Sequence, residues 1–377
     1  NMDTEEKEQP EWESDYFIIL LKTEINMENF RKKIRVGISV GDLNGIGMEV
    51  IIKTFLDKRM MDFCTPIVFA SSKVASFHKK VLEIKNFSFN IIKSFKNIND
   101  KQANLINCWD EDVVLNIGES SEEVGKYAYL SLEKAKESLK NNEIDVLVTA
   151  PINKSSIQKN KEDFIGHTEY LEQNFEGKSL MMMISSNMKI AFVTSHVPLV
   201  EVPKLLTKTK ISENLKMINE TLIQDFGIRK PKIAVIGLNP HAGEEGMLGK
   251  EEEEIIIPAI QETKEKENIL SFGPFPADSF FTPSNLKKYD AILSMYHDQG
   301  LTPFKTLSFS EGVNYTAGLN IVRTSPVHGT AFDIAGKNKA EEQSFRESVY
   351  LACDIIKKRR EYLHLRKNSL KSKKSED

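Results

Sequence analysis

Cysteine is scarce in this chain of 377 residues, which has only Cys64, Cys108 and Cys353. The three are odd in number, widely scattered and without a Cys-x-x-Cys spacing, so they form neither a disulfide framework nor a zinc-ribbon pattern. Such usage fits a reducing compartment. We therefore expect a cytoplasmic protein in which these thiols are small buried hydrophobic groups.

Long hydrophobic runs and an excess of positive charge are also absent. The longest apolar candidates, around Phe17 to Leu21 and Ile255 to Ile257, fall far short of the roughly 18 to 20 residues that a membrane-spanning helix needs. The formal net charge is -4, and lysine-rich sequence occurs only near the C-terminal end. Neither a membrane nor a nucleic acid is therefore an expected partner.

A complete dinucleotide-binding fingerprint is missing as well. Residues 34–40 have the alternation of a strand and lead directly into the glycine-rich turn at residues 41–47. After Gly45 and Gly47, however, Val50 occupies the third glycine position of G-x-G-x-x-G, and no acidic residue ends a second strand about 20 residues later. A tight connection from strand to helix accounts for these glycines.

What the chain does have is an alternation of apolar strand patterns with amphipathic helical patterns, which predicts an α/β protein. The continuously apolar residues 145–149 suit a parallel sheet covered on both faces. The predicted strands are residues 34–40, 66–70, 113–115, 145–149, 180–184, 190–193, 232–238, 290–295 and 318–323. The predicted helices start at residue 48 or span residues 73–82, 127–139, 211–226 and 340–363.

Four histidines, His167, His196, His241 and His297, each lie on a polar turn that follows an apolar strand. The carboxyl ends of strands face a common crevice, where three imidazoles would make a divalent-metal site with an open position. Zn, Fe, Co or Ni would suit imidazoles better than Mg. A satisfied polar side chain is the simpler interpretation of one histidine alone, but recurrence at four strand ends favours a site. His78 and His364 lie in charged helical contexts and are predicted to be on the surface.

The stretch from Met295 to Lys305 places an imidazole, a carboxylate, an amide and a lysine in what reads as a polar loop after a buried strand. Lys305, Asn314 and Arg323 follow His297 at spacings of 8, 9 and 9. Lysine and arginine suit a phosphate or a carboxylate, although both also serve as solvated surface charges. Asp278 is a candidate either for orienting a ligand histidine or for capping a turn. The glutamates at 251–254 complement the start of a helix and need no metal to explain them.

Taken together, these motifs resemble the 4-hydroxythreonine-4-phosphate dehydrogenase family of vitamin B6 biosynthesis. They occur in the family's order over about residues 34–350, and as a set they are far more specific than any one of them. They are Gly41-Asp42-x-x-Gly45-Ile46-Gly47, Thr149 to Lys154, Gly166 to Glu169, Thr194 to Leu199, Gly237 to Gly243, Pro276 to Asp278, Tyr296 to Gly300, Arg323 to Ser325 and His328 to Thr330.

The resemblance implies an α/β/α fold like that of isocitrate and isopropylmalate dehydrogenases, with the active site in the cleft between two subdomains. It also implies a homodimer with the active site at the interface between subunits. Residues 34–165 and 306–365 would form the first subdomain. Residues 166–305 would form the second, which carries the dimer contact and the metal ligands. Residues 1–33 would be an N-terminal extension, and residues 366–377 a charged tail.

The resemblance also implies the chemistry. It places one divalent metal (Zn, Co, Mg or Mn) on His196, His241 and His297, and substrate contacts on His167, Thr168, Lys305, Asn314 and Arg323. Lys305 and Asp278 are the candidate catalytic residues. With NAD, or NADP, as oxidant, the family oxidises 4-phosphooxy-L-threonine to a β-keto acid, which loses carbon dioxide to give 3-amino-2-oxopropyl phosphate.

The chain departs from the family's pattern at Leu43, Met48 and Glu311, the last of which stands where a basic residue often occurs. Because a carboxylate near a phosphate is unfavourable, related substrates stay open: 4-phospho-threonate, 4-phospho-erythronate or an unphosphorylated cis-dihydrodiol acid. A catalytically silent scaffold would be expected to lack some of the eight site residues, and none is missing. A phosphate acetyltransferase-like enzyme would need neither metal nor NAD.

Overall fold

The structure is a computed structural model that describes residues 33–367. From Ile34 onward the described chain forms one compact unit. The predicted N-terminal extension lies outside the described residues except for Lys33, and the predicted charged tail does so except for residues 366 and 367, which belong to the last helix. The two predicted subdomains stay a prediction.

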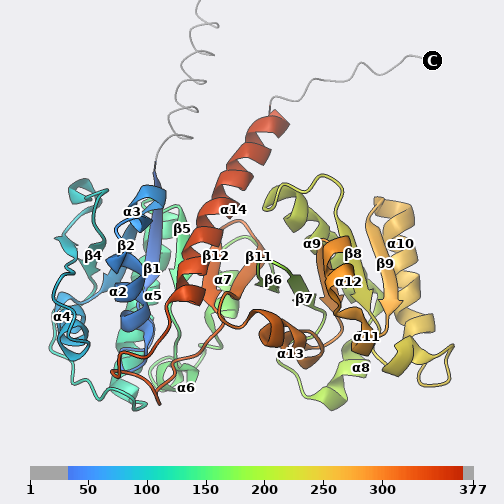
Figure 1. Cartoon of the computed structure of the whole chain (residues 1–377), viewed down its shortest axis with the longest axis horizontal. Helices are drawn as coiled ribbons and strands as arrows, with labels where there is room; N and C mark the ends of the chain where they lie inside the picture. The colour runs from blue at the N-terminus through green and yellow to red at the C-terminus, as the bar shows by residue number, and fades with distance from the viewer. Residues whose placement is uncertain (1–32, 368–377) are drawn as a thin grey trace, which may run out of the picture. The chain divides into compact units, whose positions relative to one another are not determined.

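A single twelve-stranded sheet runs through the unit in the order β3-β4-β2-β1-β5-β12-β11-β6-β7-β10-β8-β9 (Figure 1). Its strands are β1 Ile34–Ser39, β2 Cys64–Ala70, β3 Asn90–Ile92, β4 Asn104–Asn107, β5 Val146–Thr149, β6 Gly177–Ile184, β7 Lys189–Phe192, β8 Lys232–Ile236, β9 Leu270–Phe275, β10 Ala291–Ser294, β11 Val313–Leu319 and β12 Arg323–Pro326.

The helices fill the connections between these strands. They are α2 Gly47–Leu56, α3 Met60–Phe63, α4 Ser72–Val81, α5 Glu122–Lys140, α6 Lys154–Gln158, α7 His167–Asn174, α8 Val202–Leu205, α9 Lys208–Gln224, α10 Ile257–Glu267, α11 Ala277–Phe280, α12 Pro283–Lys288, α13 His297–Ser308 and α14 Gln343–Lys367. Short 3-10 segments occur at η1 Phe95–Asn97, η2 Leu199–Glu201 and η3 Pro240–Gly243, and a π-helical turn, η4 Glu252–Ile256, precedes α10.

Strand direction divides the sheet into two parallel parts joined by antiparallel strands. From β3 to β12 neighbouring strands are parallel, and from β7 to β9 they are parallel again. Between these parts, β12 with β11, β11 with β6 and β6 with β7 are antiparallel. The predicted α/β class is therefore confirmed, and so is the hairpin between β6 and β7.

The centre of the sheet is buried on both faces, as the apolar run at residues 145–149 predicts. All four residues of β5 are buried. Val146 and Val148 belong to one apolar cluster with α2 and α14, whereas Leu147 belongs to another with α5 and α7. At about 25 cal/mol per Å² of apolar surface removed from water, side chains buried in this way are the main source of stability.

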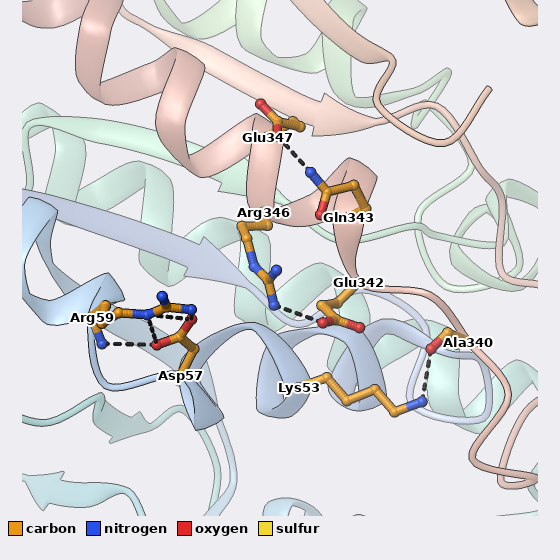
Figure 2. Close-up of polar contacts among 8 residues, drawn as sticks. All are labelled: Lys53, Asp57, Arg59, Ala340, Glu342, Gln343, Arg346 and Glu347. Carbon is orange, nitrogen blue, oxygen red and sulfur yellow. Dashed lines mark hydrogen bonds and ion pairs between the residues drawn. The ribbon is translucent and has the colours of Figure 1, made fainter. Parts of the chain in front are cut away.

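Helix α14 crosses the central strands and packs against β12, β5 and β11 (Figure 1). Its approach is fixed by Lys53 on α2, whose Nζ donates to the carbonyl of Ala340 at 2.7 Å (Figure 2) and to Oε1 of Glu49 at 2.8 Å. The same Glu49 oxygen accepts from the backbone N–H of Ala340 at 3.0 Å. On the first turns of α14, Arg346 pairs with Glu342 (Figure 2).

Several strand predictions are wrong. Residues 113–115 form no strand; Val113 and Leu115 pack against the core from an irregular segment, and Val114 points into solvent. Residues 318–323 are not one strand: Gly318, with φ +81°, and Leu319 end β11, residues 320–322 reverse the chain, and Arg323 begins the antiparallel strand β12. Strands β3, β4 and β9 were not predicted, since they are short, polar or interrupted by a Gly-Pro pair.

The setting of two histidines also differs from the prediction. His78 is buried rather than on the surface, with Nε2 2.8 Å from the carbonyl oxygen of Leu43. Burial lowers the pKa of its imidazole to about 4, so it is neutral. His167 does not follow a strand directly: α6 lies between β5 and the helix that His167 begins.

The expected character of the three cysteines is largely confirmed. All are free thiols; Cys64 and Cys353 are buried and Cys108 is partly buried. Among the described residues, none of the helices is both long enough and apolar enough to span a bilayer.

Candidate functional site

The three predicted metal ligands follow neighbouring parallel strands. His196 comes after β7, His297 after β10 and His241 after β8, and β10 lies between the other two strands. The carboxyl ends of these strands therefore meet at one edge of the sheet. The stretch around His297 is not a loop as predicted: His297 is the first residue of α13.

His196 and His297 lie close together, with ring centroids 5.7 Å apart. Phe192 stacks on the His297 ring at 5.9 Å. Nδ1 of His297 is 2.6 Å from Oδ1 of Asp298, which fixes the ring and leaves Nε2 free to face a ligand. Both imidazoles line a pocket of about 530 Å³ together with Ser195, Tyr296 and the segment from Val197 to Leu199. We call His196 and His297 the imidazole pair.

Gln299 holds the strand ends beneath the imidazole pair. Its side-chain oxygen accepts from the backbone N–H of Met295 at 2.8 Å, and its Nε2 donates to the carbonyl of Gly237 at 2.6 Å. The residue is buried. Gln299 thus ties β10 to the end of β8, a structural role that its place in a polar motif does not reveal.

His241 stands apart from the imidazole pair. It lies in η3 at φ 52° and ψ 27°, a left-handed conformation that is uncommon for a residue other than glycine. Glu252 supports this loop: its Oε1 accepts from the backbone N–H groups of Leu238 and Asn239, each at 2.7 Å. The glutamate run therefore does more than complement a helix. Within residues 33–367, no group of three histidine, cysteine or acidic side chains is close enough to hold a metal ion.

The imidazole pair nevertheless suits a divalent metal. Burial lowers the pKa of His196, and the charges of Lys154 and His297 lower it further, which favours the neutral, metal-binding form of the imidazole. The Asp298 contact is the kind that orients a ligand histidine. Two of the three predicted ligands thus fit, and the metal site as a whole stays a prediction.

A second group of polar residues gathers around Arg323 on β12, which is only 3% exposed. Its Nε and Nη2 donate to Oγ1 of Thr149 at 3.1 and 2.6 Å, and its Nη1 donates to Oγ1 of Thr316 at 3.1 Å. Burial lowers the pKa of Arg323 to about 10, while the charge of Glu169 raises it. The guanidinium therefore stays charged at neutral pH, without a carboxylate paired to it among residues 33–367.

Two predicted substrate residues keep an unpaired polar atom next to this group. Nε2 of His167 and Oδ1 of Asn314 are buried and have no hydrogen-bond partner within the described part of the chain. Burial is the largest cause of the low pKa of His167, followed by the charges of Arg323 and Lys154. Since buried polar atoms are normally paired, these two are the atoms that a ligand would satisfy.

The other predicted site residues are placed as follows. Thr168 lies in the first turn of α7 and Lys305 in the last turn of α13. Asp278 is exposed on α11, which packs against η3, so it is nearer to the His241 loop than to the imidazole pair. Glu311 accepts from Oγ of Ser186 at 2.7 Å, and its charge raises the pKa of Glu347, after the larger effect of burial.

Sequence reasoning singled out the motifs that contain Lys154, Glu169, Thr149 and Asp42 but gave these residues no role. Burial raises the pKa of Asp42 to about 6, against hydrogen bonds from the backbone of Asn44 and Gly45 that lower it, and its Oδ2 has no partner among the described residues. The signal was available: each is a charged or hydroxyl residue at the end of a predicted strand, in the turn after one or near a candidate histidine.

Comparison with known proteins identifies the family of this chain. The family model for pyridoxal phosphate biosynthetic protein PdxA matches residues 62–352. A 4-hydroxythreonine-4-phosphate dehydrogenase from Bacteroides thetaiotaomicron is 48% identical over 341 residues, which is 90% of this chain and 93% of that protein. A relative from Oceanobacillus iheyensis, named provisionally as a D-threonate 4-phosphate dehydrogenase, is 39% identical over 86% of this chain and 98% of its own.

The fold comparison points the same way. The crystal structure of 4-hydroxythreonine-4-phosphate dehydrogenase from Klebsiella pneumoniae matches with a TM-score of 0.74 and 31% identity, over 86% of this chain and 98% of that one. A terephthalate 1,2-cis-dihydrodiol dehydrogenase from Burkholderia xenovorans shares the fold at 20% identity and a TM-score of 0.57.

Proposed function

Because this chain belongs to the family of pyridoxal phosphate biosynthetic protein PdxA, we propose that it is a metal-dependent, NAD-dependent 4-hydroxythreonine-4-phosphate dehydrogenase. It oxidises 4-phosphooxy-L-threonine and releases 3-amino-2-oxopropyl phosphate and carbon dioxide, as a step towards pyridoxal 5'-phosphate. We further propose that it works in the cytoplasm as a homodimer whose active site lies between subunits.

The observation that carries the proposal is the adjacency of an imidazole pair and a buried cation. The charge of Lys154 acts on both His196 and His167, and the charge of Glu169 acts on both His196 and Arg323. These shared influences support the proposal that one small ligand meets both groups at once. A phosphorylated hydroxy acid has the matching parts, namely a hydroxyl to be oxidised and an anionic group at each end.

On this proposal, one anionic end of the substrate binds to Arg323, Lys305 and the unpaired polar atoms of His167 and Asn314. Arg323 is held by two threonine hydroxyls, so its charge is positioned before the substrate arrives and little reorganisation is needed. The enclosure of these groups at the sheet excludes water and strengthens their interaction with an anion.

The reacting hydroxyl faces the imidazole pair. His196 and His297, with His241, would hold a divalent metal, which supplies Lewis-acid polarisation of that hydroxyl when bound. NAD supplies the hydride acceptor. Asp298 keeps the His297 ring oriented, and Arg323 and Lys305 keep the substrate from rotating while hydride leaves its carbinol carbon.

The test is NADH formation from 4-phosphooxy-L-threonine by protein supplied with Zn²⁺, Co²⁺, Mg²⁺ or Mn²⁺ in turn. Conversion with at least one metal is expected, and its absence with all four would contradict the proposal. His196→Ala and His241→Ala should each lower bound metal and activity together. A variant that keeps full metal content and full activity would remove that histidine from the ligand set.

D-threonate 4-phosphate is the second candidate substrate, because relatives at 39% and 36% identity carry that provisional name. It has a hydroxyl where 4-phosphooxy-L-threonine has an amine. Comparing kcat/KM for the two compounds, under the same metal and NAD concentrations, assigns the substrate. A higher value for D-threonate 4-phosphate would replace the first candidate with the second.

A further inference from the structure

Lys154 and Glu169 lie on the same side of Gly166, although they belong to different helices. Lys154 is the first residue of α6, and Glu169 lies in the first turn of α7. A Cβ placed on Gly166 would be only 2.8 Å from Oε2 of Glu169 and 3.2 Å from Nζ of Lys154. The backbone of Gly166 is extended, with φ 165°, so a larger residue here would displace the ends of these two side chains rather than strain the backbone.

The two side chains come together beside Gly166, which directly precedes His167. Within residues 33–367, Lys154 forms no ion pair, and neither does Glu169, although their charges are opposite. The next lysine on the same segment behaves differently, because Lys159 pairs with Glu122 on the surface. Within the described residues, Lys154 therefore keeps an ammonium group beside His167 that no carboxylate pairs with directly.

Its position lies between the two halves of the site. The charge of Lys154 lowers the pKa of both His167 and His196, and the charge of Glu169 raises the pKa of both His196 and Arg323. A ligand that spans from the buried guanidinium to the imidazole pair would therefore come within reach of this ammonium group. Arg323 and Lys305 already provide cations for one anionic end of such a ligand, which leaves Lys154 for the other.

We propose that Lys154 binds the carboxylate of the substrate, and that Glu169, which shares the space over Gly166 without forming an ion pair, is a positioning residue that acts on the Lys154 ammonium through its charge. This inference rests on the proposed function. In 4-phosphooxy-L-threonine, one carbon separates the carboxylate from the carbinol carbon, whereas a carbon and an oxygen separate the phosphorus from it. A cation whose charge acts on the imidazole pair, as that of Lys154 does, therefore suits the carboxylate better than the phosphate.

A consequence follows for the reaction. The contact with Lys154 exists in the substrate and in the β-keto acid, and it ends when the carbon–carbon bond breaks and the carboxylate departs as carbon dioxide. The product, which lacks the carboxylate, keeps only the phosphate contacts. Lys154 thus favours binding of the substrate over retention of the product.

The experiment compares two probes by calorimetry on the full chain supplied with Zn²⁺ and without NAD, so that neither probe reacts. One probe is 4-phosphooxy-L-threonine, and the other is 3-amino-2-hydroxypropyl phosphate, which is the same molecule without its carboxylate. A lost charge-assisted hydrogen bond weakens binding by roughly 10- to 100-fold. Lys154→Met should therefore weaken the first probe by that factor and leave the second unchanged.

Matched variants complete the test. Lys154→Arg keeps the charge and should recover part of the affinity for the first probe, whereas Lys159→Met, on the same segment, should change neither probe. Glu169→Gln and Gly166→Ala should weaken only the probe with a carboxylate, by moving the ammonium group. Thermal denaturation of each variant checks that the fold is intact. A merely structural role of Lys154 would lower the melting temperature or weaken both probes, and would not weaken one probe alone.

The outcomes separate this inference from the proposed function. If Lys154→Met binds both probes as the unchanged protein does, Lys154 does not contact the substrate. If Lys154→Met lowers the affinity for both probes equally, Lys154 binds the phosphate instead, and the inference is overturned. If the unchanged protein binds neither probe, with any of the four metals, the proposed function itself fails.

Discussion

At the scale of single residues, the contact between His297 and Asp298 controls which imidazole nitrogen faces a ligand. Nδ1 of His297 is 2.6 Å from the Asp298 carboxylate, so the proton resides on Nδ1 and Nε2 keeps its lone pair. Asp298→Asn should lower zinc affinity by about 10- to 100-fold, as removal of such a carboxylate commonly does. Competition with a chromophoric chelator measures this.

Asp354→Asn is a suitable control for that prediction. Asp354 is an exposed residue of α14 whose nearest cation, Lys357, is 3.8 Å away, so zinc affinity should be unchanged. An Asp298→Asn protein that binds zinc as tightly as this control would show that the aspartate does not orient a ligand.

Asp42 gives a prediction on pH. Burial raises its pKa from 3.8 to about 6, so between these values the folded state binds more protons than the unfolded state. This carboxyl therefore destabilises the fold as pH rises from about 4 to 6, by on the order of 1–3 kcal/mol, and the cost persists at pH 7. Asp42→Asn, which has no charge to bury, should raise the melting temperature more at pH 7.5 than at pH 4.5.

Melting curves of the unchanged protein and of Asp42→Asn, recorded from pH 4.5 to pH 7.5, test this prediction. Asp62→Asn, at an exposed position on α3, provides the comparison. An equal effect of Asp42→Asn at both pH values would mean that Asp42 titrates near its ordinary value.

At the scale of elements, the connection from β8 through η3 depends on one buried carboxylate. Glu252 accepts from two backbone N–H groups and from the side chain of Asn239, and it is 2% exposed. Glu252→Ala leaves these buried donors unpaired, at about 1–3 kcal/mol for each unsatisfied group. The left-handed turn that carries His241 should then loosen.

We expect Glu252→Ala to lose about 2–4 kcal/mol of unfolding free energy, by urea denaturation, and to bind zinc more weakly. Glu253→Ala removes a neighbouring but exposed carboxylate and should change neither the unfolding free energy nor the zinc affinity. If Glu252→Ala lost stability but kept its zinc affinity, the η3 turn would not position a ligand.

At the scale of the whole molecule, a buried ion pair joins elements from distant parts of the chain. Arg359 on α14 contacts Asp225 at the end of α9 through Nε at 2.6 Å, and it donates to the carbonyls of Leu319 and Ile321. The hydroxyl of Tyr315 on β11 donates to the same carboxylate. The last helix is thereby fixed to both the central strands and α9.

Arg359→Met should cost about 3–5 kcal/mol, because it leaves the Asp225 charge buried without its partner. The double variant Asp225→Asn with Arg359→Met should recover part of that loss, since no buried charge remains. Lys358→Met, which removes only a surface pair with Glu361, should cost under about 1 kcal/mol. If denaturation curves showed the same loss of unfolding free energy for Arg359→Met and Lys358→Met, this account would be contradicted.

The sequence by itself determined the α/β class, most of the longer strands and helices, the family, and the residue types of the candidate site. It could do so because alternation of apolar residues and the polar residues after strands are local properties. It failed where local pattern is weak or misleading: at residues 113–115, at the β11 to β12 turn, at the helical start of α13 and at the buried His78.

Only the tertiary structure decided which side chains meet. The strand order, with β10 between β7 and β8, brings His297 beside His196, while the left-handed turn at η3 holds His241 apart from them. The placement of Lys154 and Glu169 depends on how α6 and α7 fold around Gly166. Burial likewise sets the pKa of Asp42, His78 and Arg323. Spacing along the chain cannot supply these facts, because the approach of distant segments follows from packing of the whole sheet.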